Sequence, residues 1–247
     1  MNLEKTLWIT GASSGIGEAT ALYYAQQGWT VYASARRAEA LQALAAKHSG
    51  IKPLPLDVTD TAALAAAVEH FRENGIRLTQ VVLNAGTHTP VDGRKIDVKV
   101  FRSLFEVNFF SVVNALEALY PLLHHQGGAR VGIVSSVAGL TGLPSSSAYG
   151  ATKAALNNMT EALRNDMAQD GIQLSLILPG FVKTPLTDKN DFPMPWMISA
   201  EKAAESIFKG MDAGRFIITF PRRMYWALRI LSFLPKKLYF RLLSRPL

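Results

Sequence analysis

Short apolar segments alternate with longer alanine-rich or amphipathic segments along almost all of the 247 residues. Near-continuous apolar segments of this kind are typical of strands that are buried on both faces of a parallel sheet. Each connection between two parallel strands must then be a right-handed crossover, usually through a helix. The sequence therefore predicts a single α/β domain, doubly wound and Rossmann-type, with a mostly parallel sheet and helices on both faces.

The hydrophobic content of 49% suits one well-filled core, and no change in composition marks a linker before the last residues. We therefore expect one α/β domain over residues 1–220 and a C-terminal extension over residues 221–247. Strands are predicted at 6–9, 30–34, 54–56, 81–83, 130–135, 173–178 and 215–220. Helices are predicted at 16–27, 38–48, 61–74, 98–123 (which Pro121 could shorten), about 149–169 and 200–211.

A glycine-rich turn, Thr10-Gly11-Ala12-Ser13-Ser14-Gly15-Ile16-Gly17, lies between the first strand and the first helix. Glycines there allow a tight turn and close approach of the backbone to a pyrophosphate, and the helix N-terminus offers N–H donors and the positive end of its dipole. A plain glycine-rich turn without a ligand remains the alternative. The residues expected to bind a cofactor here are Gly11, Ser13, Ser14, Gly15, Ile16 and Gly17.

Two arginines follow the second predicted strand, in Ala35-Arg36-Arg37. A cofactor without a 2′-phosphate would be met there by an acidic residue, whereas guanidinium groups suit a phosphate. The alternative is that both arginines are solvated loop residues. The pattern favours NADP(H) over NAD(H), with Arg36 and Arg37 as binding residues.

Tyr149 and Lys153 are four residues apart in a predicted helix, so their side chains share one face, one turn apart. A Lys cation near a phenol favours the phenolate and would lower a pKa that is ordinarily near 10. Such a tyrosine could donate or accept a proton near neutral pH. An ordinary surface pair has the same spacing, so this motif needs support from the rest of the chain.

Taken together, these motifs resemble the classical short-chain dehydrogenase/reductase family over nearly the whole chain. Thr10 to Gly17 is similar to its T-G-x-x-x-G-x-G turn, and Tyr149 to Lys153 to its Y-x-x-x-K motif. Further matching positions are Asp57-Val58 on the adenine side, Asn84-Ala85-Gly86, Asn108, Ser136 and the stretch from Pro179 to Thr184. Ser135, the neighbour of Ser136, is distinguished from it only by this resemblance.

The resemblance implies hydride transfer between NADP(H) and a carbonyl or alcohol. Ser136 would hydrogen-bond the carbonyl oxygen, and Tyr149 would protonate it. Lys153 would hold the nicotinamide ribose and lower the Tyr149 pKa, while Asn108 would hold a water that relays protons. The implied cofactor-binding set adds Asp57, Val58, Asn84, Ala85, Gly86, Tyr149, Lys153, Pro179, Gly180, Val182 and Thr184. The family also commonly forms homo-oligomers.

An apolar substrate pocket is expected beside this set. Residues 186–199 place apolar side chains between two prolines and could form a lid, although a solvated connector is equally consistent with their first half. The predicted substrate-binding residues are Ser136, Leu140, Leu143, Tyr149, Phe181, Met194 and Trp196. His88 could edge the same site, but a solvated loop histidine is the simpler interpretation.

The C-terminal extension carries the positive charge of the protein. Residues 221–247 contain seven Lys and Arg residues and no Asp or Glu, which accounts for the net charge of +7. Their alternation with apolar residues, interrupted at Pro235, predicts two short amphipathic helices. The apolar face could contact a membrane, pack on the body or pack on a sister subunit, and a membrane contact would suit a lipid-like substrate.

Several classes of function are disfavoured. The chain has no cysteine, its histidines lack metal-ligand spacing, and no nucleic-acid reader motif accompanies the charge, so we expect no metal and no nucleic acid. The N-terminus lacks a signal-peptide pattern, so we expect a cytoplasmic protein that can also contact a membrane surface. The alternatives to the oxidoreductase are a catalytically idle NADP(H)-binding sensor and a membrane-associated scaffold.

Overall fold

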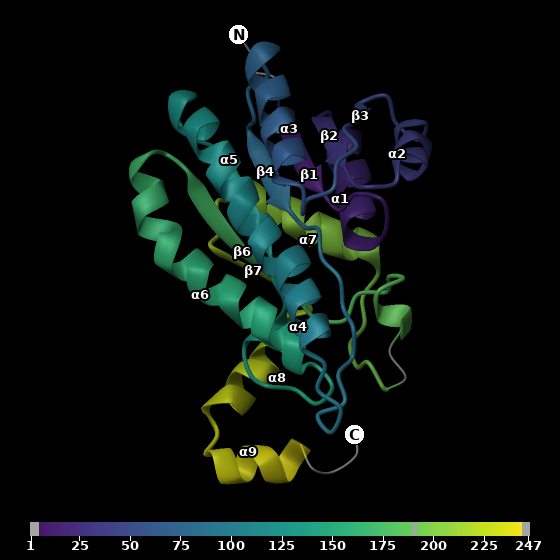
Figure 1. Cartoon of the computed structure of the whole chain (residues 1–247), viewed down its shortest axis with the longest axis vertical. Coiled ribbons are helices and arrows are strands. Elements are labelled where there is room, and N and C mark those ends of the chain that lie inside the picture. Colours follow the sequence, from purple (N-terminus) through teal and green to yellow (C-terminus); the bar gives the residue numbers. More distant parts are fainter. Residues whose placement is uncertain (1–4, 190–191, 244–247) are drawn as a thin grey trace.

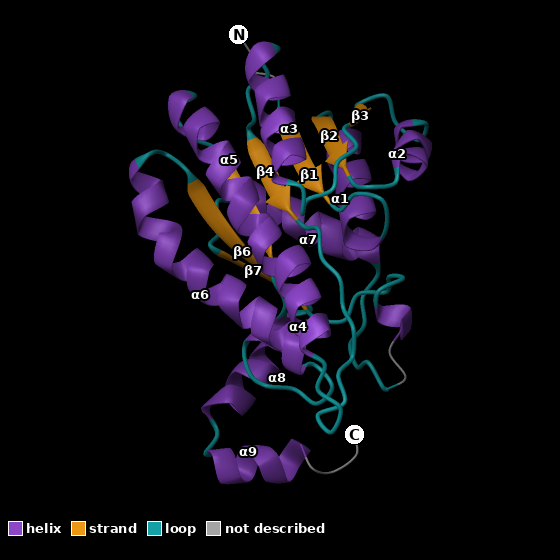
Figure 2. Cartoon of the chain, viewed as in Figure 1, coloured by secondary structure: helices purple, strands orange, loops and turns teal. Residues whose placement is uncertain are grey.

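A seven-stranded parallel sheet forms the centre of the computed structural model, which describes residues 5–189 and 192–243 (Figures 1 and 2). The strands are β1 (Thr6–Thr10), β2 (Thr30–Ser34), β3 (Ile51–Pro53), β4 (Gln80–Leu83), β5 (Arg130–Val134), β6 (Gln173–Pro179) and β7 (Ile217–Phe220). Their order is β3-β2-β1-β4-β5-β6-β7, and each neighbouring pair is parallel. The doubly wound fold predicted from the sequence is therefore confirmed.

Helices cover both faces of this sheet. They are α1 (Gly15–Gln26), α2 (Ala38–Ala45), α3 (Thr61–Glu73), α4 (Val98–Phe105), α5 (Ser111–His125), α6 (Ser147–Gln169), α7 (Ala200–Asp212), α8 (Arg222–Phe233) and α9 (Lys236–Leu243). Tyr24 and Ile207 bring α1 and α7 into the core on one face, and Phe71 and Leu119 bring α3 and α5 into the core on the other. Figure 1 shows α3, α5 and α6 in front of the sheet, with α1 and α7 behind it.

Side-chain caps explain where three of the helices begin. The Asp60 carboxylate accepts hydrogen bonds from the first backbone N–H groups of α3, and Asp97 and Ser199 do the same for α4 and α7. These groups have no partner within the helix, so a capping oxygen stabilises each start by about 1 kcal/mol.

The third strand does not lie where the sequence analysis placed it. It was expected at residues 54–56, but β3 spans Ile51–Pro53, and Ile51 is the register partner of Val31. A proline argues against a strand in most contexts, yet it is tolerated at a sheet edge, where its missing N–H is not needed. The pairing with the β2 side continues beyond β3 into residues 54–56, since the backbone N–H groups of Leu54 and Leu56 donate to the carbonyl oxygens of Ala33 and Ala35.

The long helix expected at residues 98–123 consists of two α-helices joined by a π-helical turn at Glu106–Phe110. Pro121 does not shorten it, because α5 continues to His125, with Leu119 and Leu123 fully buried on either side of the proline. Packing of the apolar face outweighs the hydrogen bond that the proline removes. Other boundaries differ by one to three residues: α2 ends at Ala45, α6 begins at Ser147 and β7 begins at Ile217.

The carboxyl ends of the strands all meet one edge of the sheet, where the chain leaves β1 and β4 in opposite directions. In an open α/β sheet this reversal opens a crevice, which is the usual ligand site. Beyond β7, α8 and α9 extend the molecule at its lower end in Figure 1. Within the described residues, every helix is either too short or too polar to cross a bilayer.

Candidate active site

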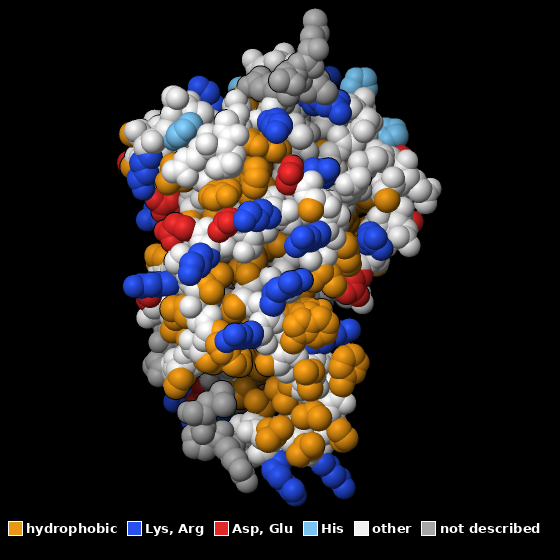
Figure 3. Space-filling view, turned by 180° about the vertical axis from the view of Figure 1, so that it is seen from behind, with side chains coloured by type: hydrophobic (Ala, Val, Ile, Leu, Met, Phe, Trp, Pro, Cys, Tyr) orange, Lys and Arg blue, Asp and Glu red, His pale blue; other side chains and the backbone are white. Residues whose placement is uncertain are grey.

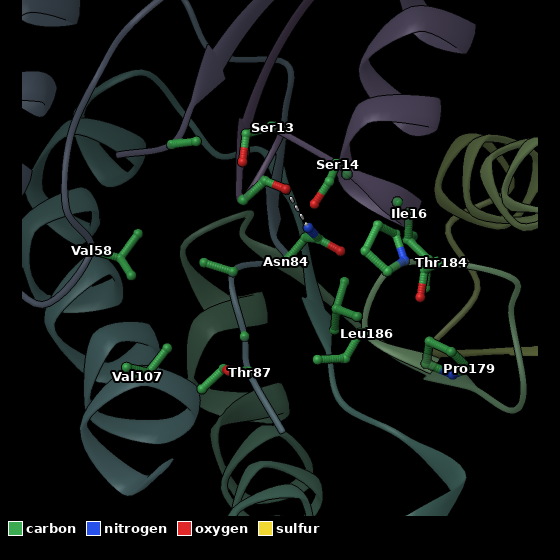
Figure 4. A pocket seen from close by; sticks show the side chains of 18 of the residues that line it. Ser13, Ser14, Ile16, Val58, Asn84, Thr87, Val107, Pro179, Thr184 and Leu186 are labelled. Carbon is green, nitrogen blue, oxygen red and sulfur yellow. Dashed lines mark hydrogen bonds between the residues drawn. The ribbon is translucent and has the colours of Figure 1, made fainter. Parts of the chain in front are cut away.

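A cavity of about 610 Å³ opens at the carboxyl ends of the central strands (Figure 4). Figure 4 shows Ser13 and Ser14 at the top and Asn84 near the centre, with Thr184 and Pro179 on one side and Val58 and Val107 on the opposite side. The structure brings every predicted cofactor-binding residue to this cavity. These residues are Gly11, Ser13, Ser14, Gly15, Ile16, Gly17, Arg36, Arg37, Asp57, Val58, Asn84, Ala85, Gly86, Tyr149, Lys153, Pro179, Gly180, Val182 and Thr184.

The glycine turn depends on the absence of side chains. Gly11 and Gly15 have φ values of +69° and +59°, in the left-handed region that favours glycine. A Cβ atom on Gly17 would stand 2.3 Å from the Gly11 carbonyl oxygen and 2.5 Å from Asn84 Nδ2. Only glycine lets the start of α1 approach β1 this closely, so the turn keeps its backbone open to the cavity.

Thr10 and Asn84 join the ends of β1 and β4. The backbone N–H groups of Asn84 and Ala85 donate to Thr10 Oγ1 at 3.0 and 3.1 Å, and Asn84 Nδ2 donates to the Thr10 carbonyl oxygen at 3.0 Å. These bonds replace the sheet ladder at the point where the two strands separate. They hold the glycine turn against the Asn84-Ala85-Gly86 segment.

Arg36, Arg37 and Asp57 line the end of the cavity beside β2. Arg37 Nη2 donates to the carbonyl oxygen and the hydroxyl of Ser13, at 3.3 and 3.2 Å, so its guanidinium lies over the glycine turn. The backbone N–H of Thr59 holds the pKa of the Asp57 carboxyl below its ordinary value, with a smaller contribution from the charge of Arg36. This end of the cavity therefore presents two exposed cations and one ionised carboxylate.

Tyr149 and Ser136 meet at the opposite end of the cavity. The Tyr149 hydroxyl is hydrogen-bonded to the Ser136 side chain, and the ring packs edge-on against His88 at a centroid distance of 4.8 Å. Burial raises the pKa of this hydroxyl above its ordinary value, and the Ser136 bond offsets part of the rise. The phenol is therefore protonated at neutral pH, and His88 does edge the site.

Lys153 lies beneath the Tyr149 ring, with its Nζ 5.7 Å from the ring centroid, and is almost fully buried. Its Nζ donates to the Val134 carbonyl oxygen at 2.9 Å, and burial lowers its pKa to about 7. The expectation that Lys153 lowers the Tyr149 pKa is therefore wrong for this structure. Desolvation of the phenol dominates its pKa, and the hydrogen bond with Ser136 is the contribution that lowers it.

The buried Lys153 makes the stability of the fold depend on pH. A lysine in the unfolded chain has a pKa near 10.4, so between about pH 7 and pH 10 the unfolded state binds more protons, and the free energy of unfolding rises with pH. We expect the wild type to gain about 2 kcal/mol from pH 7 to pH 9 relative to Lys153→Met, which lacks the group. Chemical unfolding of both proteins at each pH measures this gain, and parallel pH curves would contradict it.

Ser135 and Ser136 have different surroundings, which separates two candidates that the sequence alone could not. Ser135 Oγ lies 2.6 Å from Asn157 Oδ1 and 3.0 Å from the Lys153 carbonyl oxygen, and its side chain is buried. The hydroxyl of Ser136 instead contacts Tyr149 and accepts a bond from the Ala138 N–H at 3.1 Å. Ser136 is thus the serine whose hydroxyl faces the tyrosine.

Asn108 lies in the π-helical turn and is completely buried. Its Oδ1 accepts from the Thr87 N–H at 2.8 Å, and its Nδ2 donates to the Thr87 carbonyl oxygen at 2.9 Å and to Thr152 Oγ1 at 3.2 Å. Asn108 does not line the cavity. It ties the segment after Gly86 to α6, one residue from Lys153.

The apolar residues predicted to bind substrate lie outside this cavity as the described residues form it. Leu140 and Phe181 pack with Met224 and Tyr225 of α8, while Trp196 is 48% exposed. Leu143 and Met194 are half-buried. Of the predicted lid, Leu186 and Thr187 line the cavity, and residues 190 and 191 lie outside the described part of the chain.

Sequence reasoning missed several residues that line the cavity. They are Ala35, Leu56, Thr87, Ser103, Val107, Val134, Ser135 and Pro185. Thr87 directly follows the Asn84-Ala85-Gly86 motif and could have been included on that ground. Ser103 and Val107 are four residues apart, and no sequence signal showed which face of their helix meets the sheet edge. Among the described residues, no group of three or more His, Cys, Asp or Glu side chains could hold a metal ion.

Comparison with known proteins gives concordant results. A family model described as short chain dehydrogenase matches residues 5–193. An uncharacterized oxidoreductase of Myxococcus xanthus is 35% identical over 95% of this chain and 94% of its own length. The 3-oxoacyl-(acyl-carrier-protein) reductase FabG of Thermotoga maritima is 33% identical over 87% and 86%. A crystal structure of a short chain dehydrogenase from Burkholderia cenocepacia in complex with NADP has a TM-score of 0.85 and 25% identity, over 99% of this chain and 100% of that one.

Proposed function

Because this chain belongs to the short-chain dehydrogenase family, we propose that it is an NADP(H)-dependent oxidoreductase that interconverts a carbonyl group and an alcohol. The observation that carries the proposal is that Ser136, Tyr149 and Lys153 line the same cavity as the glycine turn. A proton donor and a dinucleotide cradle therefore share one space. The NADP complex of a similar fold is consistent with this choice of cofactor.

The residues present fit a dinucleotide. The cradle at Gly11 and Gly17 is one that a Cβ atom would fill, and it opens at the N-terminus of α1, where free N–H groups favour a pyrophosphate. In the proposal, Asp57 and Val58 bind on the adenine side, and Asn84-Ala85-Gly86 supports the middle of the cofactor. Pro179, Gly180, Val182 and Thr184 bind the nicotinamide end, where Tyr149 and Lys153 hold the ribose.

When bound, NADP(H) supplies or accepts the hydride. Ser136 donates a hydrogen bond to the substrate oxygen and polarises the carbonyl, and Tyr149 donates its proton to the developing alkoxide. The raised pKa of Tyr149 supports a donor that is protonated at neutral pH, which favours reduction there. Both amide hydrogens of Asn108 are used within the protein, so a water relayed to Lys153 would have to bind to an oxygen atom of Asn108.

Arg36 and Arg37 distinguish NADPH from NADH in this proposal, because both line the cavity and two guanidinium groups suit a 2′-phosphate. We expect Arg36→Ala to weaken NADPH binding by about tenfold or more, the value of one charged hydrogen bond, with little effect on NADH. Fluorescence titration with both cofactors measures the difference. Lys52→Ala, which removes another exposed cation, is the control, and equal losses for the two cofactors would contradict the assignment.

The proposed substrate is apolar or lipid-like, which the apolar side chains of Val107 and Leu186 in the cavity lining support. The decisive experiment is NADPH consumption by the purified chain across steroids, long-chain aldehydes and small ketones. Turnover of at least one of these substrate classes supports the proposed oxidoreductase activity. Cofactor binding without consumption across the panel would instead favour an idle sensor. Homo-oligomer formation, peripheral membrane contact and a cytoplasmic location remain predictions from the sequence.

A further inference from the structure

The two C-terminal helices have an inner face that is fixed to the body of the protein. Met224 and Tyr225 of α8 are buried against Leu140 and Phe181, and a Cβ atom on Gly180 would collide with Met224 Sδ at 2.6 Å. Tyr239 of α9 is 2% exposed, and its hydroxyl donates to the Gly142 carbonyl oxygen. The extension therefore packs against the Leu140–Gly142 segment, next to Leu140 and Phe181, which were predicted to bind substrate.

The outer face of α8 is apolar and exposed, and α9 adds exposed apolar side chains next to it. On α8, Trp226, Ile230 and Phe233 follow one another at helical spacing and are 58%, 62% and 73% exposed. On α9, Leu238 and Leu242 are exposed one turn apart, and Phe240 is exposed on another side of the helix. Figure 3 shows apolar side chains gathered over this end of the molecule, with Lys and Arg side chains at its margin. An apolar patch of this extent marks an interaction surface.

All the charged side chains of the C-terminal extension are cations. No Asp or Glu follows Asp212 in the sequence. Within the described residues, Arg222, Arg223, Arg229, Lys236 and Lys237 form no salt bridge. Arg229 and Lys236 lie 4.9 Å from the ring centroids of Phe233 and Tyr239. Cations interleaved with aromatic and aliphatic side chains are typical of helices that lie in a lipid interface.

We propose that α8 and α9 bind the surface of an anionic phospholipid bilayer, with Trp226, Ile230 and Phe233 inserted among the acyl chains and the cations at the headgroups. Anionic headgroups supply the counter-charge that the extension lacks. A symmetric contact with a second copy would instead bring two sets of cations together without a carboxylate between them. The surface binds peripherally, since α8 has 12 residues and α9 has 8, too few to span a bilayer.

This orientation places Leu140 and Phe181, two of the predicted substrate-binding residues, near the bilayer, because α8 packs on them. The substrate would then be a carbonyl or alcohol dissolved in the lipid phase. This second step rests on the proposed function, whereas binding to the bilayer does not. The two are separable by experiment: vesicle binding needs no turnover, and reduction of a water-soluble ketone needs no vesicle.

The fluorescence of Trp226 reports on docking. Trp8 and Trp29 are buried, so in the Trp196→Phe variant the only strongly exposed indole is that of Trp226. We expect vesicles of phosphatidylcholine with phosphatidylserine to shift its emission to the blue and brominated acyl chains to quench it, while pure phosphatidylcholine does neither at the same lipid concentration. An unchanged spectrum with both kinds of vesicle would overturn the proposal.

Paired substitutions in the full-length chain test each part of the surface by vesicle sedimentation. Trp226→Ser with Phe233→Ser should reduce binding by tenfold or more, about the effect of two lost apolar anchors, whereas the equally exposed pair Ile96→Ser with Val98→Ser should not. Arg229→Gln with Lys237→Gln should reduce binding about 25-fold, about fivefold for each cation, whereas Lys52→Gln with Lys99→Gln should not. Equal losses in test and control pairs would overturn the proposal.

Two further measurements separate the other partners and the substrate step. Sedimentation equilibrium without lipid would reveal a second copy: a dimer lost only in Trp226→Ser with Phe233→Ser overturns the bilayer assignment, and an unchanged oligomeric state supports it.

For the substrate, a long-chain aldehyde held in anionic vesicles should be reduced severalfold faster than in neutral ones. The ratio of the reduction rates in anionic and neutral vesicles should fall to one in the double variant Arg229→Gln with Lys237→Gln. A ratio of one in the wild type would overturn the proposal that the substrate is taken from the lipid phase.

Discussion

Tyr149→Phe is expected to lower turnover by a factor of about 10²–10⁴, the usual contribution of a general acid. The substitution removes only the hydroxyl, which the structure places against Ser136 at the end of the cavity. The ring would still pack against His88, so NADPH should bind with nearly unchanged affinity. Initial rates with the best substrate of the carbonyl panel, together with a fluorescence titration of NADPH, measure both quantities.

Tyr120→Phe is the matched control for this experiment. It removes a hydroxyl that bonds Asp170 on the exposed surface of α5, away from the cavity, so turnover should stay at the wild-type level. Full activity in Tyr149→Phe would refute its role as the proton donor. Because burial raises the Tyr149 pKa, reduction should predominate at neutral pH, and alcohol oxidation, which needs the phenolate, should increase as the pH rises.

Gly17→Ala should reduce NADPH affinity by about a hundredfold, because its methyl group would stand 2.3 Å from the Gly11 carbonyl oxygen. That oxygen belongs to the backbone, so the turn itself must move, and the bonds of Asn84 to Thr10 and Gly11 must change with it. Fluorescence titration gives the affinity, and circular dichroism establishes that the variant is folded.

Gly93→Ala is the appropriate comparison, since a Cβ atom on Gly93 meets nothing within 4 Å. It should leave both stability and NADPH affinity unchanged. A folded Gly17→Ala protein with wild-type affinity would show that the pyrophosphate is not held by this turn. The two tests are independent, since one removes the proton donor with the cofactor bound and the other prevents the cofactor from binding.

The order of strands and helices was readable from the chain because each βα unit carries its own local signals. Apolar strands, capping residues such as Ser199 and the glycine turn act over a few residues. Errors arose where a nonlocal contact outweighed a local preference. Pro53 is tolerated because β3 lies at the sheet edge, and Pro121 because buried leucines hold α5 in place. The π-helical turn at Asn108 likewise has no local signature.

By itself, the sequence determined which chemical groups this protein has and in what order: a glycine turn, two arginines, a Tyr–Lys pair and a cationic amphipathic extension. Only the tertiary structure decided their electrostatic state and their neighbours. It separated Ser136 from Ser135, placed Val134 against Lys153, and buried one face of the extension while leaving the other exposed. The reason is physical: a pKa and an exposed face depend on desolvation by segments distant in the chain, and spacing along one segment does not encode them.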